Sequence, residues 1–378
     1  MTEPFKNLLN PTLVRASSKA LARSWPALDR KHFERMALKD IDALEMKARA
    51  MQIADALEAV LPQDFDAACG VIEAALAQPI ELDSVASQRD IAKHGLAGWI
   101  VWPLGEFVAR RGLAHPQRAL VALHALTQRF SAEFAIRRFI VEHPTLTLAT
   151  MQRWTCDQSA HVRRMASEGS RPRLPWGLQL KALIADPSPT LPILAALHDD
   201  PSAYVRRSVA NHLNDIAKDH PQIVVDWVQR HLPSASAERR ALLSHASRTL
   251  IKQGQAGMLA LWGAGAAFDG RCKLTVAPKR ICVGDSVQLV LSLQSSSIAA
   301  QALLIDYAIH HVKANGSTSA KVFKGWKLAL EAGQSRTLTK QHSFKPVTTR
   351  RYHAGQHAIE VSINGSTMAR ASVQLTLP

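Results

Sequence analysis

The sequence predicts a mainly α protein, in which a right-handed α-solenoid of HEAT-like helical repeats is followed by an all-β immunoglobulin-like sandwich. Three observations predict it. Most of the chain has helical spacing of its apolar residues, this region contains an internal repeat, and the last third changes to alternating strand-like sequence. A chain of 378 residues is also long for one core, which favours two domains.

The helical pattern extends from residue 13 to about residue 253. Apolar side chains recur there at three- and four-residue spacing, with many alanines and leucines, most clearly in residues 50–57 and 118–126. Prolines interrupt the pattern at intervals that suit helical hairpins, at positions 62, 116, 144, 172, 187, 201, 221 and 233. We therefore assign residues 1–253 to a helical repeat domain.

An internal repeat lies within this domain. The sequence DQSAHVRR at residues 157–164 returns as DPSAYVRR at residues 200–207, and weaker copies end in Arg137-Arg138 and Arg239-Arg240. The two copies lie 43 residues apart. A period near that length in an all-helical region is typical of HEAT-type helix pairs, whose second helices line a concave face. Repeated arginine pairs on that face predict a basic groove, as the backbone of a nucleic acid duplex requires.

The sequence changes character after residue 253. Glycines interrupt residues 254–268, which we interpret as a linker. Residues 269–378 follow the two-residue period of strands, with Asn-Gly turn signals at Asn315 and Asn364. Seven short strands are predicted, a number typical of an immunoglobulin-like sandwich, at residues 271–276, 286–293, 303–312, 320–330, 336–344, 357–363 and 367–377.

The charge balance points to a polyanionic partner. Lys and Arg outnumber Asp and Glu by 46 to 31, which gives a net charge of +15. Residues 269–378 hold fourteen Lys and Arg against five Asp and Glu, so the sandwich carries +9 and residues 1–268 carry +6. Nucleic acid is the first expectation for such an excess and an anionic membrane the second.

Other features narrow the class of protein. The sequence has no run of eighteen apolar residues and no signal peptide, so we expect a cytoplasmic protein. The four cysteines have no metal-ligand spacing and are expected to be buried reduced thiols. The sixteen histidines form no metal motif, so we predict no metal and no cofactor.

The stretch from His161 to Trp176 is the densest in candidate functional residues. A helix through its first half places Arg164, Glu168 and Arg171 on one face. The prolines at 172 and 175 then predict a stiff turn that presents Trp176 beside Glu168. The alternative interpretation is a surface salt-bridge ladder next to a core tryptophan.

Two further acidic residues are candidates. Glu133 lies in SAEFAIRRF and precedes Arg137 by four residues, so an ordinary helix ion pair is the alternative interpretation. Asp215 lies in the segment after the second repeat copy, where a polar face that caps the next repeat is equally consistent with the sequence.

Three stretches together resemble a known family. SAEFAIRRF (131–139), HVRRMASEGSRPRLPW (161–176) and YVRRSVANHLNDIAKDHP (204–221) are similar to the motifs of bacterial alkylpurine DNA glycosylases of the AlkC type, which share HEAT-like repeats with AlkD. Some AlkC proteins carry a carboxyl-terminal immunoglobulin-like domain, which agrees with the sandwich predicted here from strand patterning.

The resemblance implies an activity. It implies a DNA glycosylase that excises cationic N3-alkylated bases, chiefly 3-methyladenine and also 3-methylcytosine, from alkylated double-stranded DNA without fully flipping the base. Carried over by position, Glu133, Glu168 and Trp176 are expected in the active site, and Asp215 is a further candidate. Because none of these four candidates is a lysine, we expect a monofunctional enzyme, acting as a monomer, that leaves an abasic site and is associated with the bacterial nucleoid.

The residue types suit this chemistry. Loss of an already cationic base leaves an oxocarbenium-like sugar, which two carboxylates stabilise, and an indole attracts the charged base. We expect DNA phosphates to be held by arginines and lysines of both domains, namely Arg137, Arg163, Arg164, Arg171, Arg173, Arg206, Arg207, Lys279, Arg280, Arg350 and Arg351. The basic pairs of the sandwich suggest a clamp on the duplex, although solvating charges on edge strands would look the same.

Two other functions remain open from the sequence. A non-catalytic HEAT-repeat scaffold would bind nucleic acid through the same arginines but would not need Glu133 and Glu168 in the groove. A peripheral membrane or protein-binding adaptor is the third possibility, and its partner would not require the steep salt dependence of phosphate contacts.

Overall fold

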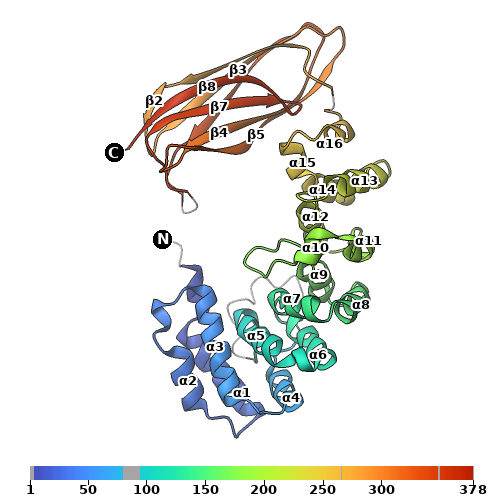
Figure 1. Cartoon of the computed structure of the whole chain (residues 1–378), viewed down its shortest axis with the longest axis vertical. Helices are drawn as coiled ribbons and strands as arrows, with labels where there is room; N and C mark the ends of the chain where they lie inside the picture. The colour runs from blue at the N-terminus through green and yellow to red at the C-terminus, as the bar shows by residue number, and fades with distance from the viewer. Residues whose placement is uncertain (1–3, 80–93, 265, 348–349, 378) are drawn as a thin grey trace. The chain divides into compact units, whose positions relative to one another are not determined.

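The computed structural model describes residues 4–79, 94–264, 266–347 and 350–377. Helices form the chain up to residue 261 and strands the chain from residue 270 (Figure 1). The described helices longer than one 3-10 turn are α1 Pro11–Ser24, α2 Arg30–Leu38, α3 Met46–Val60, α4 Phe65–Ala75, α5 Val101–Arg111, α6 Pro116–Thr127, α7 Glu133–Glu142, α8 Pro144–Trp154, α9 Ala160–Gly169, α10 Lys181–Ala185, α11 Leu191–Leu197, α12 Ala203–Ile216, α13 Pro221–His231, α14 Ala237–Ala246, α15 Arg248–Lys252 and α16 Ala256–Leu261.

Proline positions explain where several helices begin. Pro116, Pro144 and Pro221 each occupy the first position of a helix, where no intrahelical partner is needed for the missing N–H. The helices α3, α5, α7, α9, α12 and α14 contact one another in succession, while α4, α6, α8 and α11 form a second row (Figure 1). This two-layered stack agrees with the predicted repeat architecture.

The two copies of the repeat fold alike. Asp157 and Asp200 each accept a 2.8 Å hydrogen bond from the backbone two residues later, just before α9 and α12 begin. The first arginine of each pair then folds back onto that turn, with Arg163 Nη1 2.9 Å from the Asp157 carbonyl and Arg206 Nη1 2.5 Å from the Asp200 carbonyl. The repeated sequence therefore encodes a repeated helix start.

The internal contacts divide the chain into two units, Met1–Asp219 with Ala235–Ala246, and His220–Ser234 with Ser247–Pro378. The second unit thus contains α13, α15 and α16 as well as the strands, which differs from the predicted boundary at residue 253. The segment predicted as a linker contains α16, whose Leu259 is 2% exposed. Asn364 also donates to the Ala266 carbonyl at 2.8 Å, so this segment packs on the sandwich.

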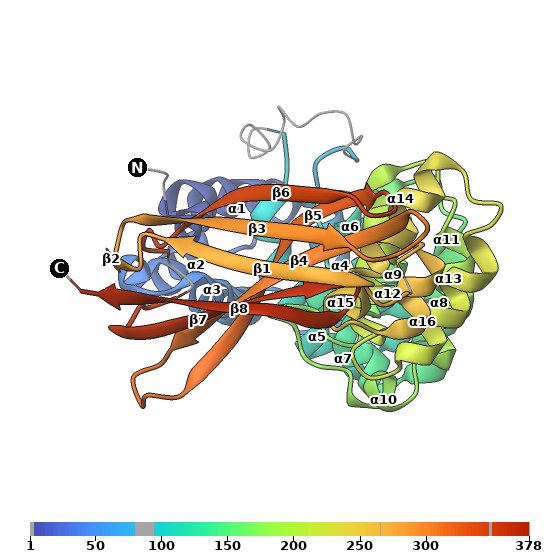
Figure 2. The ribbon, with the colours of Figure 1, turned by 90° about the horizontal axis from the view of Figure 1, so that it is seen from above.

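The strands form two sheets (Figure 2). Their order is β1-β3-β6 in one sheet and β2-β8-β7-β4-β5 in the other. Pairing is antiparallel except between β2 and β8. All seven predicted strands are present and the short β2 was missed, with bounds β1 Gly270–Ala277, β2 Arg280–Cys282, β3 Ser286–Ser295, β4 Gln301–Val312, β5 Thr318–Leu330, β6 Ser335–Ser343, β7 Gly355–Ile363 and β8 Ser366–Thr376.

Turn chemistry and alternation set the register of the sandwich. Asn364 and Gly365 both have positive φ, 47° and 83°, and join Ile363 to its partner Ser366 in a two-residue hairpin, as the Asn-Gly signal predicts. Alternate residues of β3, such as Leu289 and Leu291, are fully buried and face the core between the sheets.

Among the described residues no helix is long and apolar enough to cross a membrane. The four cysteines are free, as expected, but only Cys69 is buried. Cys156 is exposed and Cys272 and Cys282 are partly buried, so the expectation of four buried thiols is wrong. Burial raises the pKa of Cys69 to about 12.

Three histidines lie in the sandwich core. His311, His342 and His357 are 4%, 7% and 0% exposed, and all three pack against the Phe344 ring. Burial lowers the pKa of His311 to about 3 and that of His342 to about 4, and it also lowers the pKa of His357. The folded sandwich therefore keeps these imidazoles neutral.

Acid should destabilise the sandwich through these histidines. Below the ordinary histidine pKa of 6.5 the unfolded chain binds protons that the folded sandwich excludes, so the free energy of unfolding is highest above pH 6.5 and falls as the pH drops toward 4. Urea unfolding followed across this range should show a shallower pH dependence in His342→Gln than in the wild type. The half-buried His353 provides the control, and an equal slope in His353→Gln and His342→Gln would contradict the assignment.

Candidate active site

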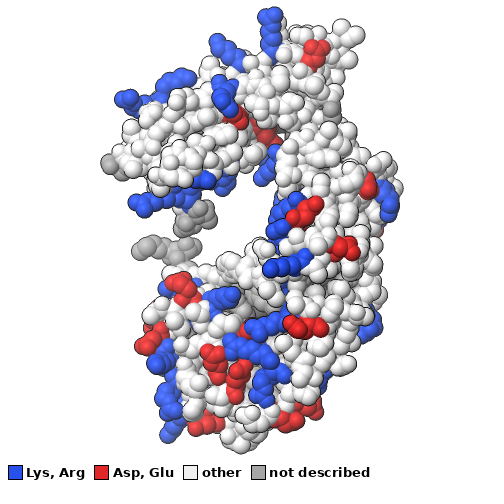
Figure 3. Space-filling view, viewed as in Figure 1, with Lys and Arg blue, Asp and Glu red and all other residues white. Residues whose placement is uncertain are grey.

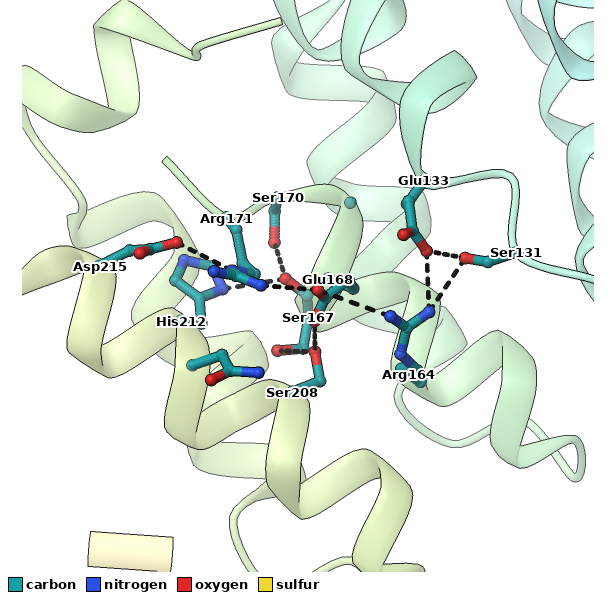
Figure 4. Close-up of polar contacts among 12 residues, drawn as sticks. Ser131, Glu133, Arg164, Ser167, Glu168, Ser170, Arg171, Ser208, His212 and Asp215 are labelled. Carbon is teal, nitrogen blue, oxygen red and sulfur yellow. Dashed lines mark hydrogen bonds and ion pairs between the residues drawn. The ribbon is translucent and has the colours of Figure 1, made fainter. Parts of the chain in front are cut away.

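Three helices of the first unit bring the acidic candidates together. Glu133 begins α7, Glu168 lies one residue before the end of α9, and Asp215 lies one residue before the end of α12. Because α9 contacts both α7 and α12, the three carboxylates join one network of hydrogen bonds and ion pairs (Figure 4). Residues from three separate sequence motifs therefore form one site.

Glu168 is the centre of the network. It is 5% exposed, and both carboxylate oxygens are engaged. Oε1 accepts from Arg171 at 2.7 Å and lies 3.5 Å from Arg164, while Oε2 accepts from Ser208 at 2.6 Å. Burial acts to raise the pKa of Glu168, but the two guanidinium groups and the Ser208 hydrogen bond outweigh it and leave the pKa below the usual 4.5. Glu168 is therefore ionised at neutral pH.

Arg164 connects Glu168 to Glu133. Its Nη1 donates to Glu133 at 2.8 Å and to Ser131 at 3.0 Å, and its guanidinium lies 4.8 Å from the centre of the Tyr204 ring. Burial disfavours this cation, but the nearby carboxylates more than compensate and raise the pKa of Arg164. Glu133 thus pairs across to α9, and the helix pair within α7 that we considered as an alternative does not account for it.

Asp215 completes the network on α12. Its side chain is 2% exposed and accepts a 2.8 Å hydrogen bond from Arg171 Nε and another of 2.8 Å from Lys218. Asp215 therefore belongs to the network, and its side chain pairs with Arg171 and Lys218, while the next described helix, α13, has no side-chain cap at its N-cap residue His220. Lys218 brings an amine next to this carboxylate, a neighbour that the sequence analysis did not anticipate.

Arg137 has a structural role, and its prediction as a DNA contact is wrong. Its side chain is 0% exposed, so it cannot reach a phosphate. The guanidinium donates to the backbone carbonyl of Gly169, the last residue of α9, at 2.8 Å. It also donates to three carbonyls of the loop that follows, those of Arg171, Pro172 and Leu178, at 2.7, 3.4 and 2.5 Å. This buried cation therefore anchors both ends of the loop that carries Trp176. Burial lowers the pKa of Arg137 to about 10.

Trp176 is positioned differently from the prediction. It is 66% exposed and has a left-handed backbone, with φ of 65°, so it is not a core tryptophan. Its ring contact is with Phe5, at 5.8 Å between centroids, and Phe5 in turn stacks edge-on against Trp99 at 4.7 Å. The N-terminal segment therefore supports this indole, whereas the sequence predicted a turn that presents Trp176 beside Glu168.

The arginines that were predicted to contact DNA differ in whether they pair within the protein or lie exposed on its surface. Arg163 forms a bidentate ion pair with Asp200, at 2.6 and 3.1 Å, and Arg206 donates to two carbonyls of the preceding turn. Arg171 is 7% exposed and occupied by carboxylates. These three residues and Arg164 therefore have partners within the protein, and their contacts with DNA phosphates stay predictions.

Other predicted contacts remain on the surface. Arg207 is exposed, as are Lys279, Arg280 and Arg351 in the second unit. Arg173 pairs with Asp219 at 2.7 Å, and Arg350 Nη1 lies 2.6 Å from His311 Nε2. Figure 3 shows Lys and Arg side chains interspersed with Asp and Glu over the part of the helical unit from α5 to α12.

Sequence reasoning missed several residues of the site. Tyr204 and Ser208 lie four residues apart on α12, and Asp215 follows seven residues later, so helical spacing places all three on one face. His212 on the same helix is fully buried, with Nδ1 3.0 Å from the Ser167 carbonyl, and burial lowers its pKa to about 4. Helical spacing counted from Asp215 toward the start of α12 is the sequence signal that could have found Ser208 and Tyr204.

Comparisons with known proteins agree with this geometry. A family model described as "DNA alkylation repair enzyme" matches residues 130–250, and one described as "Uncharacterised protein YhaZ, C-terminal Ig-like domain" matches residues 271–377. The uncharacterized protein YhaZ of Bacillus subtilis (strain 168) is 36% identical over 368 residues, which cover 95% of this chain and 96% of YhaZ.

A solved structure matches the whole chain. The alkylpurine DNA glycosylase AlkC of Pseudomonas fluorescens, bound to DNA containing an abasic site analog, is 35% identical, with a TM-score of 0.87 over 99% of this chain and 100% of that one. The chain belongs to the DNA alkylation repair enzyme family. Within that family it has the AlkC fold, with both the helical part and the immunoglobulin-like domain present.

Removing the buried guanidinium should release the loop that carries Trp176. Arg137→Met leaves four backbone carbonyls without their donor, and since hydrogen bonds to a charged group contribute about 1.5–3 kcal/mol each, we expect a loss of at least about 3 kcal/mol in unfolding free energy. Arg138→Met is the matched control on the same helix, where a partly exposed side chain pairs with Glu106. Equal urea midpoints for the two variants would contradict this role of Arg137.

Proposed function

We propose that the protein is a monofunctional DNA glycosylase that hydrolyses the N-glycosidic bond of cationic N3-alkylated bases, such as 3-methyladenine and 3-methylcytosine, in duplex DNA. The reaction leaves an abasic site. The observation that carries the proposal is the pair of carboxylates Glu133 and Glu168, which Arg164 bridges. Glu168 is ionised although it is buried, because the neighbouring guanidinium groups and the Ser208 hydroxyl lower its pKa. The structural relative AlkC, bound to DNA with an abasic site analog, supports both the reaction and the partner.

The charge of the site suits departure of a cationic base. Cleavage of the bond at C1′ moves positive charge from the base to the sugar, so the base leaves neutral and needs no strong acid. A fixed carboxylate stabilises the oxocarbenium-like sugar and orients the attacking water. Glu168, held ionised by Arg164 and Arg171, fits this role, and Glu133 is the second carboxylate.

Trp176 supplies the complementary contact to the base. Its indole is exposed and held out by the anchored loop, so it can face a base that is still stacked or only partly displaced from the duplex. A cation over an indole gains about 0.5–2 kcal/mol. We propose that Trp176 favours the charged, alkylated base over normal neutral bases without complete flipping.

Lys218 bears on the monofunctional assignment. Strand nicking by a glycosylase requires a free amine that forms an imine with the sugar. Lys218 is engaged by Asp215 at 2.8 Å, which supports its role as a partner of that carboxylate. Borohydride trapping of a protein–DNA adduct would overturn the monofunctional assignment.

A non-catalytic scaffold that binds nucleic acid is the second candidate. The exposed Arg207 and the basic sandwich favour DNA binding in either case, and through that DNA an association with the nucleoid in the cytoplasm. Buried carboxylates oppose binding of a polyanion and cost desolvation free energy. Glu168 and Asp215 in the network are therefore better explained by chemistry than by binding alone.

Removing the carboxylate charge should abolish excision while the duplex is still bound. We expect Glu168→Gln and Glu133→Gln to reduce release of 3-methyladenine from methylated duplex DNA by about a hundredfold or more, because a fixed charge aimed at the reacting sugar is lost. Chromatography of the released bases measures this. Glu142→Gln, an exposed residue at the end of α7, is the matched control. Undiminished release by the two site variants would disprove the proposed site.

The pH profile of excision should reflect the lowered pKa of Glu168. The carboxylate is the active form, so the single-turnover rate should be flat at neutral pH and fall only when the pH drops below 4.5, the ordinary glutamate value. Arg171→Gln removes one of the groups that lower this pKa and should move the fall to higher pH. A profile centred near neutrality in the wild type would contradict the assignment.

The clamp predicted for the sandwich gives a salt test. If Lys279 and Arg280 contact phosphates, the double change to Gln should weaken duplex binding and reduce the slope of log K against log salt by about 1.8. The matched control changes Arg271 and Lys273 to Gln, with the same loss of charge on the exposed face of β1. Equal effects of the two double variants would show that Lys279 and Arg280 act only through the general attraction between a basic domain and DNA.

A further inference from the structure

The face of α12 that points toward Glu168 carries a serine with an unusually confined hydroxyl. Ser208 is 2% exposed, and its Oγ donates to Glu168 Oε2 at 2.6 Å and lies 3.0 Å from the hydroxyl of Ser167 (Figure 4). It contacts the carboxylate from a different helix than the two arginines do, since Arg164 lies within α9 and Arg171 lies two residues after its end. The carboxylate is therefore held from two sides.

The two arginines alone leave the carboxylate plane undetermined. Both act on Oε1, Arg171 at 2.7 Å and Arg164 at 3.5 Å. The terminal torsion of glutamate, about the Cγ–Cδ bond, is broad and roughly two-fold, so contacts to one oxygen define the carboxylate plane less sharply than contacts to both. The Ser208 hydroxyl is the contact that fixes Oε2, and with it the direction of the remaining lone pairs.

We propose that Ser208 is a positioning residue for the glycosylase reaction, which orients the plane of the Glu168 carboxylate toward the sugar and its attacking water. This rests on the proposed function of Glu168. A misdirected carboxylate would still bind alkylated DNA but would stabilise the developing charge on the sugar less well. Ser208 therefore acts through Glu168 and needs no contact with DNA.

The chain offers a matched control two residues along from Glu168. Ser170 is 0% exposed, but its Oγ donates to the backbone carbonyls of Ala166 and Ser167, at 2.7 and 3.3 Å. Replacing Ser170 by Ala removes a buried hydroxyl of the same kind without touching the carboxylate. A purely structural role for Ser208 would make the two alanine variants equivalent.

The experiment compares single-turnover excision from methylated duplex DNA by the full-length wild type, Ser208→Ala, Ser208→Thr and Ser170→Ala. We expect Ser208→Ala to lose about ten- to a hundredfold in rate, with unchanged affinity for the duplex. Its acid limb should also move to higher pH, because the hydrogen bond that favours the ionised form is lost. Ser208→Thr, which keeps the hydroxyl, should restore the rate, and Ser170→Ala should behave as the wild type.

An equal rate and an equal acid limb in Ser208→Ala and Ser170→Ala would overturn the inference.

If the wild type releases no alkylated base, that result refutes the proposed function by itself. The Ser208 hydrogen bond is then tested separately by the carboxyl titration of Glu168, observed by carbon NMR and assigned with Glu168→Gln. A titration midpoint that Ser208→Ala leaves unchanged would overturn the inference in that case.

Discussion

Every feature of the site follows from the need to pair charges that are buried. Glu168 and Asp215 are 5% and 2% exposed, and an unpaired carboxylate at that depth would cost several kcal/mol. Arg171 meets this requirement by donating to both, through Nη1 to Glu168 and Nε to Asp215. Because one residue satisfies carboxylates from α9 and α12, the two helices cannot separate without exposing a bare charge. Arg171 lies at the start of the loop after α9, so these two bonds also fix the position from which the loop runs to Trp176.

The salt-bridge ladder that was weighed as the alternative interpretation of residues 161–176 is present, and it forms part of the buried network of the candidate active site. The ladder from Arg164 through Glu168 to Arg171 forms as helical spacing predicts. It differs from a surface ladder because α7 and α12 cover it, and burial turns weak pairs into strong constraints. The repeat contributes by assigning its two arginines different tasks. The first of each pair ties the helix to its turn, whereas the second differs between the copies, since Arg164 joins the carboxylate network and Arg207 is exposed.

The fold was largely predictable because its signals are local. Two-residue alternation and Asn-Gly turns located seven strands, and three of the prolines that interrupt the helical pattern, Pro116, Pro144 and Pro221, are the first residues of helices. The site was predictable in its acidic members but not in the tasks of its arginines. Whether a guanidinium points to water or to a backbone carbonyl depends on the cavity that neighbouring helices leave. Charge and spacing therefore suggested Arg137 as a phosphate ligand, although four carbonyls surround it. Phe5 was missed because a single ring has no sequence pattern of its own. Ser208 was missed because helical spacing back from Asp215 indicates a shared face but not which of its residues reaches the carboxylate.

The exposed indole of Trp176 affects the stability of the folded protein. An ordered tryptophan in water, on a left-handed backbone, lowers the stability of the free protein, and the anchored loop beneath it must compensate. The benefit comes later, because a side chain that is already immobilised loses little conformational entropy on contact with a ligand. Recognition is thus prepared during folding. Substitutions that relieve the strained backbone of this loop would raise the stability of the free protein and reduce the preorganisation of the indole. The loop therefore leaves the protein less stable than its helices alone would allow.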